Sequence, residues 1–183
     1  METLSRRTGL VRIVLTGSES TGKSTLAAAL ARHYGVELVP EFVRTLAEQK
    51  HGAIAFSDHG PIARGQIALE DEHIARATRL LIQDTDLMST VVYCRHYFDR
   101  CPPWIEETAR ERRPDLYLVC QPDIPWVADG VRDRGHLREE MQELFRQAIA
   151  ASGAASVELR GTLEERLARA IDAIDGLLAQ AAP

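Results

Sequence analysis

The stretch Gly17-Ser18-Glu19-Ser20-Thr21-Gly22-Lys23-Ser24 decides the fold class of this chain. It fits the pattern G-x-x-x-x-G-K-[ST], in which a glycine-rich loop surrounds the phosphates of a nucleotide. A short, apolar, β-branched run (11–16) precedes it, and a run rich in helix-forming residues (24–32) follows it. The motif requires a strand, a loop and a helix in this order. The context therefore predicts a true phosphate-binding loop rather than a glycine turn that happens to precede a helix.

The chemistry of this loop assigns roles to its residues. Glycine permits close backbone approaches and positive φ angles, so that successive N–H groups can point inward and bind an anion. The start of the following helix adds unpaired N–H groups and a positive dipole end. We expect Lys23 to reach the β- and γ-phosphates of ATP and the Ser24 hydroxyl to bind Mg²⁺. The predicted nucleotide contacts of this region are Gly17, Ser18, Glu19, Ser20, Thr21, Gly22, Lys23, Ser24 and Thr25.

Composition limits the kinds of protein to consider. The 183 residues, of which 45% are hydrophobic, predict a single domain (1–183) with flexible ends at 1–9 and 180–183. A net charge of −5 argues against nonspecific nucleic-acid binding, and no apolar run reaches membrane-spanning length. The first nine residues are polar and too short for a secretory signal, and the three cysteines form no C-x-x-C pair. We therefore expect a cytoplasmic protein with no nucleic-acid or membrane partner; its oligomeric state is not predicted.

Alternation of short apolar runs with helical patterns predicts an α/β fold. Strands are expected at 11–16, 36–39, 80–83, 116–120 and 156–159. Helices are expected at 24–34, 42–50, from a Ser57 cap to 78, 87–98, 105–112, 137–150 and 162–179, with Gly35 ending the first of them. This order implies a five-stranded parallel sheet with helices on both faces.

In such a sheet the ligand lies at the carboxyl ends of the strands, so the polar residues that follow each strand should converge. Glu41 can accept the proton of an acceptor hydroxyl, and Arg44 can bind the acceptor or the transferred phosphoryl group. Asp84 stands where a carboxylate commonly holds Mg²⁺, and Asp86 can face the acceptor as an alternative base. The competing interpretations are that Glu41 favours a helix dipole and that Asp84 or Asp86 caps the next helix.

Two later segments complete the predicted site. Residues 121–136 are polar and rich in glycine and proline, as expected of a lid that closes over phosphates. Arg132 is the expected lid cation, with Arg134 and Arg138 as further candidates; the alternative is a solvated surface loop. Gly161 is expected beside the adenine, although Thr162 can equally be a helix cap in a plain turn.

These motifs together resemble one family. The loop, Glu41-Phe-Val-Arg44, Asp84-Thr-Asp86 and Pro125-Trp-Val-Ala-Asp-Gly-Val-Arg132 are similar to the nicotinamide riboside kinase domain of NadR-type P-loop proteins, over about 11–169. The resemblance implies the P-loop NTPase fold of nucleoside kinases, with ATP, Mg²⁺ and phosphoryl transfer to nicotinamide riboside, giving nicotinamide mononucleotide. It also implies acceptor contacts from Glu41, Phe42, Arg44, Asp86 and Trp126. Pro40 stands where the family has an aromatic residue, so Phe42 is the candidate replacement. From its length of 183 residues we expect the chain to lack the nucleotidyltransferase domain of NadR proteins.

Other functions stay open at this point. No N-K-x-D motif indicates a GTPase, and no L-S-G-G-Q motif indicates an ABC-type ATPase. A NadR-like regulatory ATPase without a metabolite acceptor is one alternative, and a kinase for another nucleoside is a second. Whether Glu41 or Asp86 is the base is also left open.

Overall fold

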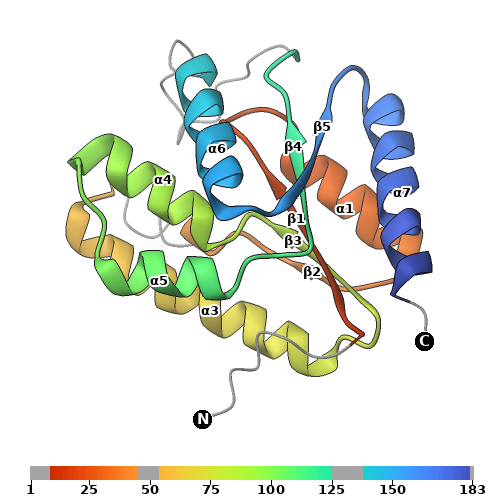
Figure 1. Cartoon of the computed structure of the whole chain (residues 1–183), viewed down its shortest axis with the longest axis horizontal. Coiled ribbons are helices and arrows are strands. Elements are labelled where there is room, and N and C mark those ends of the chain that lie inside the picture. The colour runs from red at the N-terminus through yellow and green to blue at the C-terminus, as the bar shows by residue number, and fades with distance from the viewer. Residues whose placement is uncertain (1–8, 45–53, 125–137, 182–183) are drawn as a thin grey trace.

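A computed structural model describes residues 9–44, 54–124 and 138–181. Its centre is a five-stranded sheet in the order β2-β3-β1-β4-β5, with every neighbouring pair parallel (Figure 1). The strands are β1 (Val11–Thr16), β2 (Leu38–Val39), β3 (Leu80–Asp84), β4 (Leu116–Cys120) and β5 (Ala155–Leu159). The predicted fold class is confirmed: this is a P-loop α/β fold.

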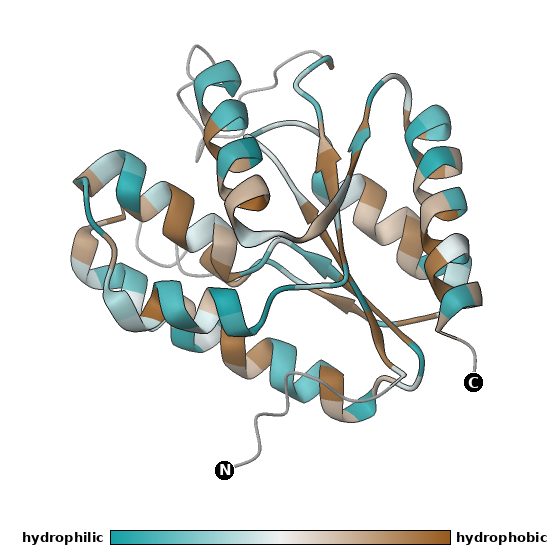
Figure 2. Cartoon of the chain, viewed as in Figure 1, coloured by the Kyte–Doolittle hydropathy of each residue, from teal (hydrophilic) through white to brown (hydrophobic). Residues whose placement is uncertain are grey.

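Helices cover both faces of the sheet because its central strands are apolar on both sides. The helices are α1 (Lys23–Tyr34), α3 (His59–Arg76), α4 (Leu87–Phe98), α5 (Pro103–Glu111), α6 (Arg138–Ser152) and α7 (Leu163–Gln180). Helices α1 and α7 bury the side of β1 that carries Ile13 and Leu15, whereas α4 and α6 bury the side that carries Val14. Helix α5 packs outside α3 and α4. Figure 2 shows the brown, apolar strands enclosed by helices whose outer sides are mostly teal.

The register of the sheet brings the functional segments to one edge. Strand β1 pairs with β3 on one side and with β4 on the other, so that Leu15 lies opposite both Asp84 and Leu118. All five strands run in the same direction, and their carboxyl ends therefore lie together. The loop after β1, the carboxylates after β2 and β3 and the start of the segment after β4 meet there.

Several element boundaries differ from the sequence prediction. Strand β2 begins at Leu38 rather than Val36, because the Val36 N–H bonds to Ala31 O at 3.0 Å and so completes the end of α1. Gly35 ends α1 in the left-handed conformation, as expected. Ser57 is not a helix cap: it lies in a 3₁₀ turn, η1 (Phe56–Asp58), and the Asp58 carboxylate accepts the Ala55 N–H at 2.7 Å instead.

Helix α5 starts two residues before the predicted Ile105, with Pro103 in the first turn, where its missing N–H costs nothing. Helix α3 ends at Arg76, two residues earlier than predicted. Of the helix expected over 42–50, residues 42–44 are helical and the rest lies outside the described residues. Within the part of the chain that the structure describes, no helix combines the length and apolarity that crossing a bilayer requires.

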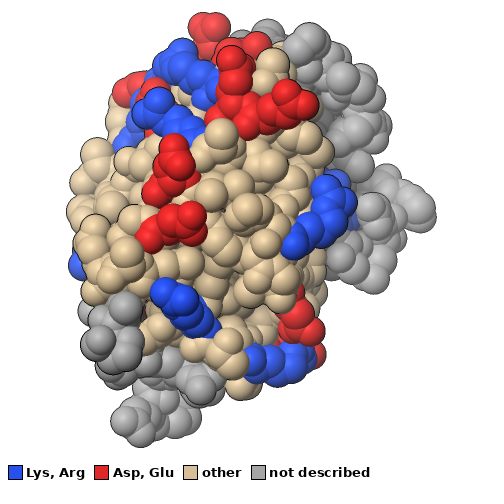
Figure 3. Space-filling model, turned by 90° about the vertical axis from the view of Figure 1, so that its right-hand side faces the viewer, with Lys and Arg blue, Asp and Glu red and all other residues tan. Residues whose placement is uncertain are grey.

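Charge is mixed on the face that Figure 3 presents. Acidic and basic side chains lie next to each other there, with uncharged surface between the groups. Nucleic-acid-binding proteins instead gather lysine and arginine into one patch or stripe. The described charges that Figure 3 shows therefore form no patch of a single sign.

Candidate active site

The backbone of the phosphate loop needs its glycines at two positions. Gly17 has φ 126° and Gly22 has φ 81°, both in the region that disfavours a side chain. A Cβ on Gly17 would lie 2.6 Å from the carbonyl oxygen of Cys120, at the end of the neighbouring strand β4. The loop can therefore pass this close to β4 only with glycine at position 17. Ser20 also has a positive φ, 52°, at the turn of the loop.

Side chains from distant elements fix the loop in place. Gln142 of α6 accepts the Ser18 N–H at 2.9 Å and donates to Cys120 O at 3.2 Å, so one buried amide joins the loop to β4. Within the loop, the Thr21 hydroxyl donates to Ser18 O at 2.9 Å. Because the loop is already fixed, it loses little conformational entropy when an anion binds.

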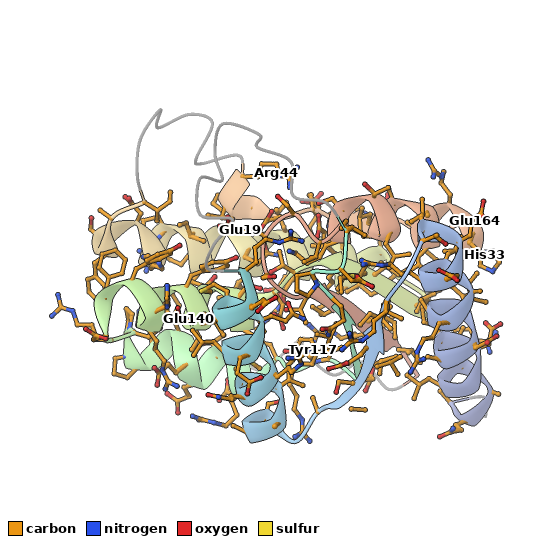
Figure 4. The ribbon with its side chains drawn as sticks, turned by 90° about the horizontal axis from the view of Figure 1, so that it is seen from above. Glu19, His33, Arg44, Tyr117, Glu140 and Glu164 are labelled. Carbon is orange, nitrogen blue, oxygen red and sulfur yellow. The ribbon has the colours of Figure 1, made fainter. Side chains whose placement is uncertain are left out.

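Lys23 lies inside the loop that it is predicted to serve. Its ammonium donates to Gly17 O at 2.9 Å and Ser18 O at 2.7 Å, and the residue is only 9% exposed. These carbonyls hold the cation inside the loop. Ser24 is half-buried in the first turn of α1, whereas Thr25 beside it is exposed. Figure 4 looks onto this edge of the molecule and labels Glu19 of the loop.

The segment after β2 reaches the phosphate loop. The Arg44 guanidinium donates to the Ser24 hydroxyl at 3.3 Å and lies 3.6 Å from the Glu41 carboxylate. Figure 4 shows Arg44 at the same edge as the loop residue Glu19. Arg44 thereby contacts the predicted metal ligand, although the two residues are 20 positions apart in the sequence, and Glu41 lies beside Arg44. The arrangement places Glu41, Arg44 and Ser24 in one site.

Phe42 is held against helix α3. Its N–H donates to the Gln66 side-chain oxygen at 3.0 Å. Its ring lies over Gly65, where an added Cβ would come within 2.2 Å of the ring carbons. The ring and peptide of Phe42 are both fixed from α3. The buried amide nitrogen of Gln66 has no hydrogen-bond partner within 9–44, 54–124 and 138–181. A substrate contact from Phe42 stays a prediction.

Asp84 is the last residue of β3 and is almost fully buried. One of its carboxylate oxygens, Oδ1, has no hydrogen-bond partner among the described residues. A buried carboxylate oxygen without a donor is unfavourable unless a cation or water satisfies it. Together with the Ser24 hydroxyl, this oxygen offers the all-oxygen donor set that Mg²⁺ prefers. The residues present thus fit the predicted metal.

Asp86 has a structural role that the sequence allowed as an alternative. Its carboxylate caps α4 by accepting the Met88 N–H at 3.1 Å, and it also accepts the Tyr117 hydroxyl at 2.7 Å. Burial raises the pKa of Asp86 to about 7; the Tyr117 hydrogen bond opposes this increase, and the charge of Glu70 adds to it. Thr85, between the two aspartates, has φ 68°, a strained angle for a β-branched residue. Asp86 is therefore a capping group that titrates near neutral pH, and a role as base stays a prediction.

The predicted lid falls mostly outside the described residues, and with it Trp126, Arg132 and Arg134. The third candidate, Arg138, is described: its guanidinium donates to Ser20 O at 3.2 Å and to Ile124 O. It therefore contacts the outside of the phosphate loop. After β5, Thr162 caps α7 in a reciprocal pair with Glu165. The Gly161 N–H bonds to Asp123 at 2.7 Å, and its contact with adenine stays a prediction.

Three buried polar residues of the site were missed by sequence reasoning: Gln66, Gln142 and Arg166. Each lies on a helix far along the chain from the segment it holds. The signal that was available is a polar residue at a core-facing position, such as Gln142 between the core residues Met141 and Phe145. Such a position indicates a buried partner but does not identify it.

Comparisons with known proteins show the family to which this chain belongs. The AAA_28 family, described as an AAA domain, matches residues 12–166. The trifunctional NAD biosynthesis/regulator protein NadR of Escherichia coli (strain K12) is 32% identical over 139 residues, which are 73% of this chain and 34% of that protein. This chain thus spans about a third of the length of its curated relatives.

Solved structures show the same relationship. A crystal structure of NadR protein in complex with NR matches with a TM-score of 0.79 and 26% identity, over 92% of this chain and 49% of that chain. A second, in complex with NAD and AMP-PNP, gives 0.80 and 25%, over 93% and 50%. The thymidylate kinase from Ehrlichia chaffeensis shares the fold at 16% identity, with a TM-score of 0.66 over 91% of this chain and 99% of that chain.

The sequence carries a complete phosphate loop, the structure places it at the edge of a five-stranded parallel sheet, and the family match covers most of the chain. The chain therefore belongs to the AAA_28 family of P-loop domains and is a relative of NadR.

Proposed function

We propose that this protein is an ATP- and Mg²⁺-dependent kinase that phosphorylates nicotinamide riboside to nicotinamide mononucleotide. The observation that carries the proposal is the contact of Arg44 with Ser24 at 3.3 Å, with Glu41 paired to the same guanidinium. A nucleotide switch needs only the phosphate loop, whereas a kinase needs acceptor-binding groups beside the transferred phosphoryl group. The NadR structure in complex with NR supports a nucleoside as acceptor.

The donor side of the reaction follows from the loop. Its backbone N–H groups and the N-terminus of α1 would bind the phosphates of ATP, and Lys23 would turn from the Gly17 and Ser18 carbonyls toward the β- and γ-phosphates. Ser24 and Asp84 would hold Mg²⁺, which when bound neutralises charge on the phosphate oxygens. The NadR structure with AMP-PNP supports ATP as the donor.

The acceptor side follows from Glu41 and Arg44. Phosphoryl transfer needs the attacking hydroxyl oriented in line with the leaving group and its proton accepted. Glu41 is half-buried and lies beside Arg44, so its carboxylate can accept the proton of the 5′-hydroxyl while Arg44 attracts the phosphoryl oxygens. Asp86 is less suited to contact substrate, because both of its oxygens already accept hydrogen bonds inside the fold. We therefore assign the base to Glu41 and keep Asp86 as the alternative.

A coupled assay with ATP, Mg²⁺ and a panel of nucleosides that includes nicotinamide riboside tests the proposal. We expect saturable formation of nicotinamide mononucleotide, with weaker turnover of other nucleosides. Turnover of a different nucleoside with none of nicotinamide riboside would correct the acceptor. ATP hydrolysis that no nucleoside stimulates would overturn the kinase and indicate a NadR-like regulatory ATPase.

A further inference from the structure

A buried arginine that belongs to none of the predicted ligand contacts joins three segments of the donor side. Arg166 lies in the first turn of α7 and is 3% exposed. Its Nε donates to Gly161 O at 2.9 Å, Nη1 donates to Thr21 O at 2.6 Å, and Nη2 donates to Gln121 O at 3.1 Å and to the Asp123 carboxylate. Three of its four acceptors are backbone carbonyls in the phosphate loop, after β4 and before α7.

Burial of the Arg166 guanidinium is unfavourable unless its hydrogen bonds compensate for the lost hydration. A guanidinium loses a large hydration free energy when it is buried, and this loss is compensated only when its N–H groups are well hydrogen-bonded. Arginine can reach four acceptors because its fork is planar and carries five donors, whereas lysine presents a single compact ammonium. The guanidinium also approaches the loop itself: a Cβ on Gly22 would lie 3.9 Å from Nη1.

Asp123 completes the cluster as its counter-charge. One carboxylate oxygen accepts from Arg166, and the other accepts the Gly161 N–H at 2.7 Å. Burial opposes ionisation of Asp123, but the Gly161 N–H and the Arg166 charge together lower its pKa below the ordinary value. The pair therefore stays charged at neutral pH and holds the turn before α7 against the residues that follow β4.

We propose that Arg166, with Asp123, is a positioning residue that keeps the phosphate loop in its nucleotide-binding conformation by tying Thr21 to the ends of β4 and β5. The proposal deepens the proposed function, on which it rests for the role of the loop. It predicts that changes at Arg166 weaken ATP binding and leave the KM for the acceptor unchanged, because the contacts of Arg166 do not include the 41–44 segment or α3.

The test compares R166K with R146K. Arg146 of α6 also contacts residues after β4 and on β5, through Gln121 Oε1 at 2.6 Å and Glu158 at 2.9 Å, but these two partners lie outside the phosphate loop. We expect R166K to weaken ATP binding about tenfold, since it loses most of a set of charge-assisted hydrogen bonds, and R146K to leave it within about twofold. D123N, which keeps one acceptor oxygen, should give a smaller loss than R166K. The measurements are calorimetric ATP affinity, the KM for each substrate and thermal melting.

The outcomes separate this proposal from the proposed function. Unchanged ATP affinity in both R166K and D123N overturns the proposal. An equal increase in the KM for ATP and the KM for the acceptor, accompanied by a lower melting temperature, also overturns it. Weakened ATP binding with an unchanged acceptor KM supports it. If the wild-type protein binds ATP but phosphorylates no nucleoside, the proposed kinase function is wrong. The ATP affinities of R166K and R146K can still be compared in that case. A wild-type protein that binds no ATP overturns both.

Discussion

The two halves of the site are built in different ways. The phosphate loop is held from several elements at once: by its own backbone, by Gln142 of α6 and by Arg166 of α7. The described acceptor segment, residues 41–44, is held by the Phe42 contacts to α3 and by the longer Arg44 bonds of 3.3 and 3.6 Å. The comparison teaches that the phosphate loop is fixed through many contacts, whereas the segment that we propose to bind the acceptor is held by a few side chains.

The largest effect is expected from removing the donor-side cation. K23A should lower phosphoryl transfer by at least about 10³-fold, because no other group replaces the ammonium at the transferred phosphate. Folding should survive, since the bonds lost to Gly17 O and Ser18 O lie at the edge of the sheet. Single-turnover transfer and circular dichroism measure the two effects. If a folded K23A protein retained phosphoryl transfer, the assignment of the phosphate loop to the donor side would be wrong.

The metal site comes next. D84N should lower the rate by about 10²-fold and shift the Mg²⁺ titration to higher concentration, because a ligand charge is lost. Its melting temperature should be unchanged or slightly higher, since the Asp84 Oδ1 atom has no partner in the fold. Kinetics as a function of Mg²⁺ and thermal melting test both statements. A Mg²⁺ curve identical to wild type would remove Asp84 from the metal site.

On the acceptor side, G65A should displace the Phe42 ring, because a methyl group cannot fit where the ring carbons would lie 2.2 Å away. We expect the acceptor KM to rise about tenfold with the KM for ATP unchanged. The matched control is G176A in α7, where nothing lies within 4 Å of an added Cβ. If G65A changed the two KM values equally, the separation of the two halves would be wrong.

The raised pKa of Asp86 leads us to expect opposite effects of pH on activity and on stability. If it must be ionised, the rate should rise about fivefold to tenfold between pH 6 and 8, because burial raises its pKa to about 7. Its folded pKa exceeds the unfolded value, so its stabilising contribution is complete below about pH 4 and is lost as pH rises through 7. D86N should remove this slope from the free energy of unfolding, measured by urea titration across pH. A rate independent of pH over this range would leave Asp86 as a cap alone.

The smallest effect is expected at the edge of the donor half. T162A removes the α7 cap, in which the Thr162 hydroxyl accepts the Glu165 N–H at 3.2 Å, and should cost about 1 kcal/mol of stability. ATP affinity should stay within about twofold, since the Arg166 contacts remain. Thermal melting and calorimetry report the two quantities. A loss of ATP affinity as large as that of R166K would mean that the cap, and not the guanidinium, positions the loop.

Much of this architecture was predictable because it depends on local signals. The five strands and the order of elements follow from short apolar runs and helical spacing, and the loop follows from its glycines. The errors lie where a backbone group has a competing partner, as when Val36 bonds to α1 instead of joining β2, or where the Ala55 N–H bonds to Asp58 and Ser57 lies inside the turn η1. Those choices depend on hydrogen bonds that residue patterns do not specify.

The sequence by itself determined the phosphate loop, the parallel α/β fold and the positions of Glu41, Asp84 and Asp86 at the carboxyl ends of their strands, because motif spacing and strand direction are properties of the chain. Only the tertiary structure decided that Arg44 meets Ser24, that Asp86 is buried beneath Tyr117 and that Gln142 and Arg166 hold the loop. The physical reason is that such contacts join residues up to 145 positions apart. Their geometry exists only once the sheet has brought its strand ends together and the helices have packed on both faces.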